Sequence, residues 1–244
     1  MTPFAAFDRI RIINLASRPD RRREMQGELA RVGLGDDPRV GFFDAVASDS
    51  ASPWRAKGER GVFLSHLAIL QEAAKSGESV LILEDDADFT PALADLHVDP
   101  GTQIFYGGYD ATSPGPLVDS DIVGAHCMGF SRDIVPLLVA FLEPLQAHHS
   151  PPPIDGAYVW YRRAHPETRT QFAEPVVAVQ RPSRSDIAHP KQIDRIPVLR
   201  ALAPVARRAK RSILRGEISF GLREAIMLAA AGVAIAVAVA LHHL

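Results

Sequence analysis

Short apolar runs typical of β-strands alternate with helical patterns as far as Gln180. The β-branched run from Arg9 to Leu15 predicts a buried first strand, and Val80 to Leu83 predicts another. Between them, Gly61 to Ala74 has the apolar spacing of a helix packed on a sheet. Strands that alternate with helices are typical of α/β proteins with a mainly parallel sheet. We therefore expect an α/β fold with its ligand site beyond the carboxyl ends of the strands.

Other segments complete this predicted fold. Further strands are expected at residues 42–45, 103–106, 124–130 and 176–180, and further helices at 21–32 and 134–145. Gly107 and Gly108 predict a turn after the strand that ends at Tyr106. A chain of 244 residues is long enough for one α/β domain with a sizeable core.

The C-terminal segments differ from the rest in composition. Residues 1–194 form the predicted domain, and residues 195–224 are mostly basic and apolar, which predicts an amphipathic connector on an anionic membrane surface. Residues 225–244 are apolar on every helical face and predict a membrane tail helix that spans the bilayer or lies on it. A solvated linker and a buried helix are the respective alternatives. The basic residues before the tail place the predicted domain on the cytoplasmic side of the cytoplasmic membrane.

Charge and cysteine content bear on nucleic-acid binding, disulfides and zinc sites. The chain has 27 basic and 29 acidic residues, so nothing in its balance predicts a nucleic-acid partner. A lone cysteine, Cys127, excludes an internal disulfide and a cysteine-built zinc site.

Three consecutive carboxylates, Glu84-Asp85-Asp86, follow the predicted strand at 80–83. Like charges this close repel one another, and burial adds a desolvation cost. A divalent cation removes both, and ligands that are all oxygen favour Mg²⁺ or Mn²⁺. Glu84 and Asp86 are the candidate metal ligands because alternate residues of a strand point the same way. Such a cation neutralises the charge of a leaving nucleoside diphosphate. A solvated acidic turn or a helix cap is the alternative interpretation.

The same segment admits a different chemistry. Asp86-Ala87-Asp88-Phe89-Thr90 superficially resembles the nucleophile loop of haloacid-dehalogenase-type phosphatases, in which the first Asp attacks phosphorus. In that family the loop follows the first strand and has a glycine where this chain has Phe89.

Taken in order, several short motifs resemble glycosyltransferase family 25, the lipooligosaccharide and procollagen galactosyltransferase group. The motifs are Ile13-Asn14-Leu15 with Arg18 to Arg22, Gly61 to His66, Val80 to Asp86, Gly124 to Arg132, Pro153-Ile154-Asp155, and Pro175 to Gln180 with Ser185. Val62 stands where the family usually has cysteine, and Phe130 stands where it has tyrosine. The connector and the tail lie outside the resemblance.

The resemblance implies a GT-A-like, Rossmann-type nucleotide-sugar domain that uses a UDP-sugar, often UDP-galactose, with inversion at the anomeric carbon. Glu84 and Asp86 then occupy the position at which the family binds its metal ion and the diphosphate of the donor. Asp86 is in addition a candidate catalytic residue. Asp155 is the candidate base for the acceptor hydroxyl; a helix N-cap is its alternative or additional role. The expected donor-binding residues are Asn14, Arg18, Arg22, Ser65, His66, Asp85, Gln180 and Ser185.

Membrane topology and resemblance together predict the acceptor. An enzyme tethered at the cytoplasmic membrane lies beside lipid-linked glycans, so we expect a saccharide acceptor of an envelope polysaccharide or lipopolysaccharide. A phosphohydrolase built on Asp86 and Asp88, and a catalytically silent nucleotide-sugar-binding membrane protein, remain the alternatives.

Overall fold

The computed structural model describes residues 3–112, 116–181 and 212, and Met1–Gln180 form a compact unit. The described residues contain no helix that is long and apolar enough to cross a membrane. The predicted tail at 225–244, and the connector at 195–224 apart from Ser212, lie outside the described residues.

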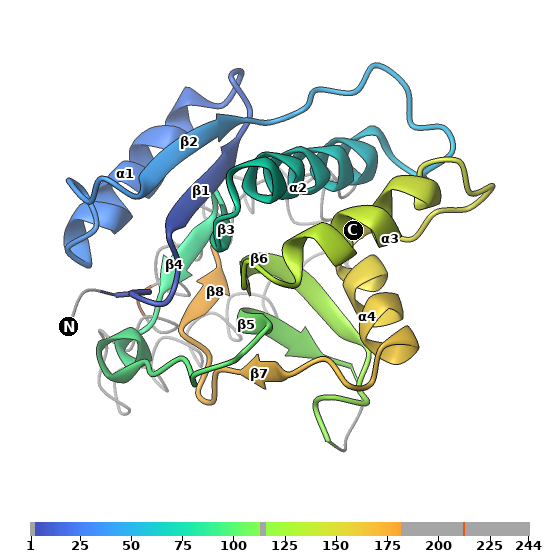
Figure 1. Ribbon diagram of the computed structural model, residues 1–244. Coiled ribbons are helices and arrows are strands. Elements are labelled where there is room, and N and C mark those ends of the chain that lie inside the picture. Colours follow the sequence, from blue (N-terminus) through green and yellow to red (C-terminus); the bar gives the residue numbers. More distant parts are fainter. Residues whose placement is uncertain (1–2, 113–115, 182–211, 213–244) are drawn as a thin grey trace, which may run out of the picture. The chain divides into compact units, whose positions relative to one another are not determined.

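Strands and helices alternate along this unit (Figure 1). In chain order the elements are β1 (Arg9–Asn14), α1 (Pro19–Arg31), β2 (Val40–Asp44), α2 (Lys57–Ser76), β3 (Val80–Glu84), β4 (Ala87–Phe89), the 3₁₀ helix η1 (Pro91–Asp95), β5 (Ile104–Ala111), β6 (Ile122–Phe130), α3 (Val135–Leu145), α4 (Ile154–Ala164), β7 (Thr170–Phe172) and β8 (Ala178–Gln180).

The main sheet has six strands in the order β2-β1-β3-β6-β5-β7. The strand β1 is parallel to both β2 and β3, whereas β6 is antiparallel to its neighbours β3 and β5. The edge strand β7 is parallel to β5. Only β6 therefore runs against the other five strands, and the predicted α/β fold with a mainly parallel sheet is confirmed.

Helices α2, α3 and α4 cover one face of the sheet (Figure 1). Leu67 of α2, Leu138 of α3 and Tyr158 of α4 are buried in one apolar cluster with Ile82 of β3 and Met128 of β6. Successive side chains of a strand point to opposite faces, so Leu81 and Leu83 of β3 lie on the other face of the sheet.

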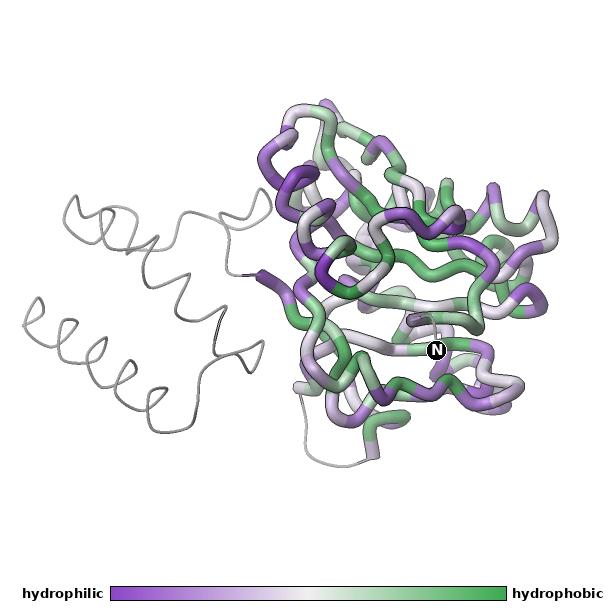
Figure 2. Tube along the Cα trace, turned by 90° about the vertical axis from the view of Figure 1, so that its left-hand side faces the viewer, coloured by the Kyte–Doolittle hydropathy of each residue, from purple (hydrophilic) through white to green (hydrophobic). Residues whose placement is uncertain are grey.

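The opposite face is covered by α1 and by the small sheet of β4 and β8. Met25 and Leu29 of α1 and Phe89 of β4 pack there with Leu81 and Leu83. Hydrophobic residues accordingly concentrate along the inner strands, and hydrophilic residues on the outer turns and helix faces (Figure 2).

Two expectations about this part of the chain were wrong. The predicted strand at 176–180 does not join the main sheet, because β8 pairs antiparallel with β4 in a separate sheet. Gly107 and Gly108 do not form a turn, because both lie within β5. A Cβ at Gly108 would lie 2.2 Å from Nε2 of His126, so that ring requires a glycine there.

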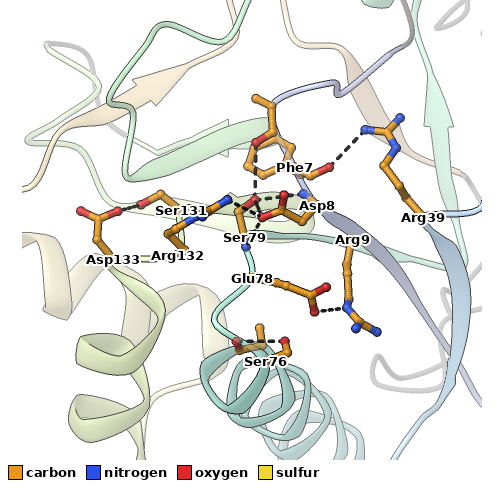
Figure 3. A network of polar contacts seen from close by, with 12 residues as sticks. Phe7, Asp8, Arg9, Arg39, Ser76, Glu78, Ser79, Ser131, Arg132 and Asp133 are labelled. Atoms are coloured by element: carbon orange, nitrogen blue, oxygen red, sulfur yellow. Dashed lines mark hydrogen bonds and ion pairs between the residues drawn. The ribbon is translucent and has the colours of Figure 1, made fainter.

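At the amino edge of the sheet, polar groups join the starts of β1 and β3 to the end of β6 (Figure 3). The carboxylate of Asp8 accepts hydrogen bonds from the backbone N–H of Ser79 at 2.8 Å and from its hydroxyl at 2.7 Å. Arg132 Nη2 donates to the same carboxylate at 3.2 Å. These bonds lower the pKa of Asp8, and Arg9 pairs with Glu78 beside them. At this edge Asp8 and Glu78 each have an arginine partner.

Candidate active site

The opposite, carboxyl edge of the sheet gathers the acidic residues. In the register of β1 and β3, Ile13 lies beside Glu84, so Asn14 and Asp85 follow at neighbouring strand ends. Asp85 and Asp86 form the turn that leads from β3 into β4. The antiparallel β6 begins at this edge, which brings Gly124 near the same place. Strand ends that are distant in sequence therefore converge here, as expected for a ligand site in an α/β sheet.

Asp85 is held by buried Asn14 and by partly buried Arg21. Asn14 donates from Nδ2 to Asp85 Oδ2 at 2.7 Å, and Arg21 donates from Nη1 to Asp85 Oδ1 at 2.9 Å. The same Arg21 nitrogen lies 3.3 Å from Asp86 Oδ2. Asn14, Asp85 and Asp86 are all buried, at 2%, 6% and 5% exposure. One guanidinium at the start of α1 thus partly neutralises two adjacent carboxylates.

Glu84 lies in an environment that disfavours its ionised form. Burial, followed by the negative charges of Asp86, Asp85 and Asp155, raises the pKa of Glu84 to about 8, and Arg21 opposes the shift. Glu84 therefore carries a proton near neutral pH unless additional positive charge is present. A cation beside these carboxylates would favour the ionised form of Glu84.

Asp155 reaches the cluster from the start of α4. Its Oδ2 accepts a hydrogen bond from the backbone N–H of Gly124 at 2.9 Å, and its Oδ1 accepts from the N–H of Gly156 at 2.8 Å. The N-cap of α4 is Pro153, so the interpretation of Asp155 as an N-cap was wrong; it is a first-turn residue. The bond to Gly124 ties the helix to β6 and turns the carboxylate toward the edge where Glu84 ends β3.

The oxygen ligands available for a cation are limited. Among the described residues, no group of three His, Cys, Asp or Glu side chains is placed to hold a metal ion. Asn14 and Arg21 engage both oxygens of Asp85, and Arg21 also contacts one oxygen of Asp86; Glu84 and Asp86 remain the predicted pair. Mg²⁺ in particular is commonly bound through one or two carboxylates, with water and substrate phosphates completing its shell. The carboxylates of Glu84 and Asp86 are chemically suited to binding Mg²⁺ in this manner.

Two predicted phosphate-binding arginines lie at the rim of the site. Arg18 precedes α1 and pairs through both Nε and Nη2 with Asp20, at 3.1 and 2.9 Å. This pairing lowers the pKa of Asp20 to about 2. Arg22 lies over the ring of Phe42 at 4.3 Å, and its Nη1 is 3.9 Å from the carboxylate of Asp44. Their roles in donor binding remain predictions.

Ser65 and His66, also predicted to bind the donor, are completely buried in α2. The Ser65 hydroxyl donates to the carbonyl of Gly61 at 2.7 Å and accepts from the backbone N–H of Val46 at 2.9 Å. His66 Nδ1 lies 3.0 Å from the hydroxyl of Tyr158. In this structure both side chains join elements of the protein, and direct contact with a donor remains a prediction.

The small sheet brings Gln180 to the site. In the pairing of β4 with β8, Gln180 lies opposite Ala87, the residue that follows Asp86, and its side chain is exposed. Asp88 belongs to β4 and is 1% exposed, rather than part of an open loop as a phosphatase nucleophile segment requires. Ser185 lies outside the described residues.

Arg21 is the residue of this site that the sequence did not single out. Its neighbours Arg18 and Arg22 belong to the same arginine-rich turn, and composition alone does not separate the three. The helical phase does carry a signal, because Arg21 lies one turn before Met25 and two turns before Glu28, which are both buried.

Comparison with known proteins identifies the segment that carries most of this cluster. The sequence model of glycosyltransferase family 25 (LPS biosynthesis protein) matches residues 7–99. Residues 7–99 are a family 25 glycosyltransferase segment. The predicted family and the enzyme class are confirmed by this match. The family 25 segment contains Asn14, Arg21 and the carboxylates at 84–86, whereas Asp155 and Gln180 lie beyond it.

Solved structures with a similar arrangement of the chain include three enzymes. A glycosyltransferase involved in the glycosylation of the major capsid of PBCV-1 has a TM-score of 0.45 and 12% identity, covering 72% of this chain and 94% of that one. Mouse xyloside xylosyltransferase 1 has a TM-score of 0.41 and 10% identity, covering 68% and 84%. CTP:phosphocholine cytidylyltransferase from Streptococcus pneumoniae has a TM-score of 0.37 and 12% identity, covering 71% and 72%.

No curated protein sequence matches the chain. The assignment to family 25 therefore rests on the match over residues 7–99.

Proposed function

We propose that this glycosyltransferase moves a hexosyl group, galactose in the first instance, from a UDP-sugar to a saccharide acceptor of an envelope polysaccharide or lipopolysaccharide. The observation that carries the proposal is the convergence of Glu84, Asp85, Asp86 and Asp155 at the carboxyl edge of the sheet. The family 25 match over the segment that supplies three of these carboxylates supports it. We propose that the domain carrying this site has a GT-A-like nucleotide-sugar fold.

The raised pKa of Glu84 supports binding of a divalent cation, Mn²⁺ or Mg²⁺. Excess negative charge at Glu84 and Asp86 is relieved by a cation, which in turn supplies the charge that stabilises a leaving diphosphate. Glu84 and Asp86 would hold the cation, and Asn14 orients Asp85 beside them. Arg21, which now pairs with Asp85 and Asp86, is close enough to share in holding the diphosphate.

Asp155 is proposed as the base of an inverting transfer. The acceptor hydroxyl oxygen bonds to the anomeric carbon on the face opposite the nucleotide while Asp155 takes the hydroxyl proton. The bond from the anomeric carbon to the phosphate oxygen breaks, and UDP leaves with the electron pair. Each Asp155 oxygen accepts one backbone N–H, and a carboxylate oxygen has a second lone pair for the proton.

We further propose that the connector at 195–224 and the tail at 225–244 hold the enzyme at the cytoplasmic membrane with its catalytic domain on the cytoplasmic side. The apolar, uncharged tail and the basic residues before it support this topology. Protease accessibility in intact cells tests it, because digestion of the catalytic domain from outside the cytoplasmic membrane would contradict the proposal.

Thermal stability of the full chain with a panel of nucleotide-diphosphate sugars tests the donor. At about 100 times its dissociation constant, a ligand stabilises the folded state by about 2.7 kcal/mol. We expect this shift with UDP-sugars and Mn²⁺, its loss in Asp86→Asn, and its retention in Asp44→Asn. Asp44 is the matched control because it ends β2 at the same edge with an exposed carboxylate.

Turnover then separates the transferase from the alternatives. We expect UDP release that requires an acceptor and that survives Asp88→Asn better than Asp86→Asn. Equal loss in both variants, with phosphate released in the absence of an acceptor, would favour a phosphohydrolase. Sugar-nucleotide binding without any turnover would identify a catalytically silent descendant.

A further inference from the structure

The polar pair formed by His66 and Tyr158 is buried in the apolar core between α2 and α4. Both side chains are 0% exposed, and His66 Nδ1 lies 3.0 Å from the Tyr158 hydroxyl. The two rings meet edge to face with their centroids 5.9 Å apart. Tyr158 also packs on Phe130 of β6, with a centroid distance of 5.0 Å. This hydrogen bond joins the two helices within a largely apolar cluster.

Both members of the pair are neutral. Desolvation lowers the pKa of His66 to about 3, and burial raises the pKa of Tyr158 well above its usual value of 10. The hydrogen bond therefore persists throughout the physiological pH range. His66 Nε2 has no hydrogen-bond partner among the described residues, so the imidazole interacts with polar groups on one side only.

Packing alone does not require such a pair. Replacing both partners of a buried hydrogen bond by apolar groups of similar shape is often close to neutral for stability. A buried hydrogen bond does supply a fixed relative orientation of the two elements that it joins. Here those elements are α2, which packs on the sheet, and α4, which carries Asp155 one turn before Tyr158.

Three contacts fix the start of α4. Trp54 Nε1 donates to the carbonyl of Pro152 at 3.2 Å, immediately before the helix. Asp155 accepts from the N–H of Gly124, and Tyr158 meets His66 one turn later. The first two contacts hold the beginning of the helix. The third fixes its depth and its rotation about its axis near Asp155, while Arg162 anchors the far end of α4 through hydrogen bonds to the carbonyls of Leu117, Val118 and Ser120. That rotation, together with the hydrogen bond from Gly124, decides where the Asp155 carboxylate points.

We propose that His66 is a positioning residue that, through the hydroxyl of Tyr158, orients α4 so that Asp155 faces the site at Glu84. This inference rests on the proposed function, in which Asp155 takes the proton of the acceptor. It gives His66 an indirect role in the transfer step in place of donor contact.

Tyr158→Phe in the full chain tests this role, because it keeps the ring and removes only the hydroxyl. With the donor that the binding panel ranks first, we expect kcat to fall about tenfold while KM for the donor stays within about twofold. Tyr161→Phe is the matched control: Tyr161 is buried on the same helix, but its hydroxyl interacts with Thr168, away from α2. Circular dichroism and urea unfolding confirm that each variant is folded.

The decisive comparison uses Asp155→Asn as a background. If Tyr158 acts through Asp155, Tyr158→Phe lowers kcat in the wild-type background and has no further effect when Asp155 is already asparagine. An additional fall in that background, or equal effects of Tyr158→Phe and Tyr161→Phe, would overturn the inference while leaving the proposed function intact. Full activity of Asp155→Asn would overturn the base assignment and the inference together.

Discussion

Replacing Glu84 by glutamine should remove a large part of the pH dependence of stability. In the folded protein the pKa of Glu84 is raised to about 8 from 4.5, first by burial and then by the charges of Asp86, Asp85 and Asp155. Between these two pH values the unfolded chain has released the proton while the folded protein still holds it. The stabilisation due to this proton is complete below pH 4.5 and is lost as pH rises through about 8.

The magnitude follows from the size of this window. A difference of one bound proton changes the free energy of unfolding by about 1.4 kcal/mol per pH unit, so the carboxyl group can destabilise the protein by up to about 5 kcal/mol across the window. Glutamine has nearly the same shape as protonated glutamate and does not titrate. We expect Glu84→Gln to gain at least about 2 kcal/mol relative to the wild type between pH 5 and pH 8.

Urea unfolding of the full chain at pH 5, 6, 7 and 8, followed by the fluorescence of its two tryptophans, buried Trp54 and exposed Trp160, measures this gain. Subtracting the wild-type profile from that of Glu84→Gln cancels the titrating groups that do not interact with Glu84 and leaves the contribution of Glu84 and of the carboxylates around it. Parallel profiles, with the same difference at each pH, would refute the reasoning. A gain toward low pH would refute it more strongly, because the sign would be reversed.

Other variants probe the surroundings of the site. Arg21→Gln removes the positive charge that opposes the shift of Glu84, so the pKa of Glu84 should rise further and the loss of stability should move to higher pH in the same unfolding series. Gly61→Ala should destabilise by about 2 kcal/mol in urea unfolding, because its Cβ would lie 2.5 Å from the carbonyl oxygen of Val46. Gly27→Ala is its control, since Gly27 is a helical position with nothing within 4 Å of the added Cβ; it should gain about 0.5–1 kcal/mol.

The sequence predicted the main features of the fold because they depend on local patterns. Runs of β-branched residues such as Arg9 to Leu15 and Val80 to Leu83 marked β1 and β3 within one residue of their ends. The pairing of β8 with β4 could not be predicted from local patterns, since the sequence of a three-residue strand does not indicate which strand it pairs with. Gly107 and Gly108 suggested a turn, but the structure requires glycine there for another reason. The side chains of Cys127 and His126, from the neighbouring strand β6, lie too close to these positions for a Cβ, and the sequence does not reveal that contact.

The same distinction applies to the candidate site. The carboxylates at 84–86 could be found because they follow an apolar strand, and the parallel neighbour β1 brings Asn14 to Asp85. The contact of Arg21 with two of these carboxylates depends on the phase of α1, which Met25 further along the helix indicates but the arginine-rich first turn by itself does not. The contact of His66 with Tyr158 joins residues 92 positions apart and follows only from the packing of α2 against α4.

The most direct test of the central claim is sugar transfer by the full-length protein, measured as UDP release from UDP-galactose and other UDP-sugars with Mn²⁺ and a saccharide acceptor. We predict release that depends on both the cation and the acceptor and that falls at least about 100-fold in Asp86→Asn but not in Asp44→Asn. A folded protein that binds no sugar nucleotide, or that turns one over equally well without Asp86, would contradict the account.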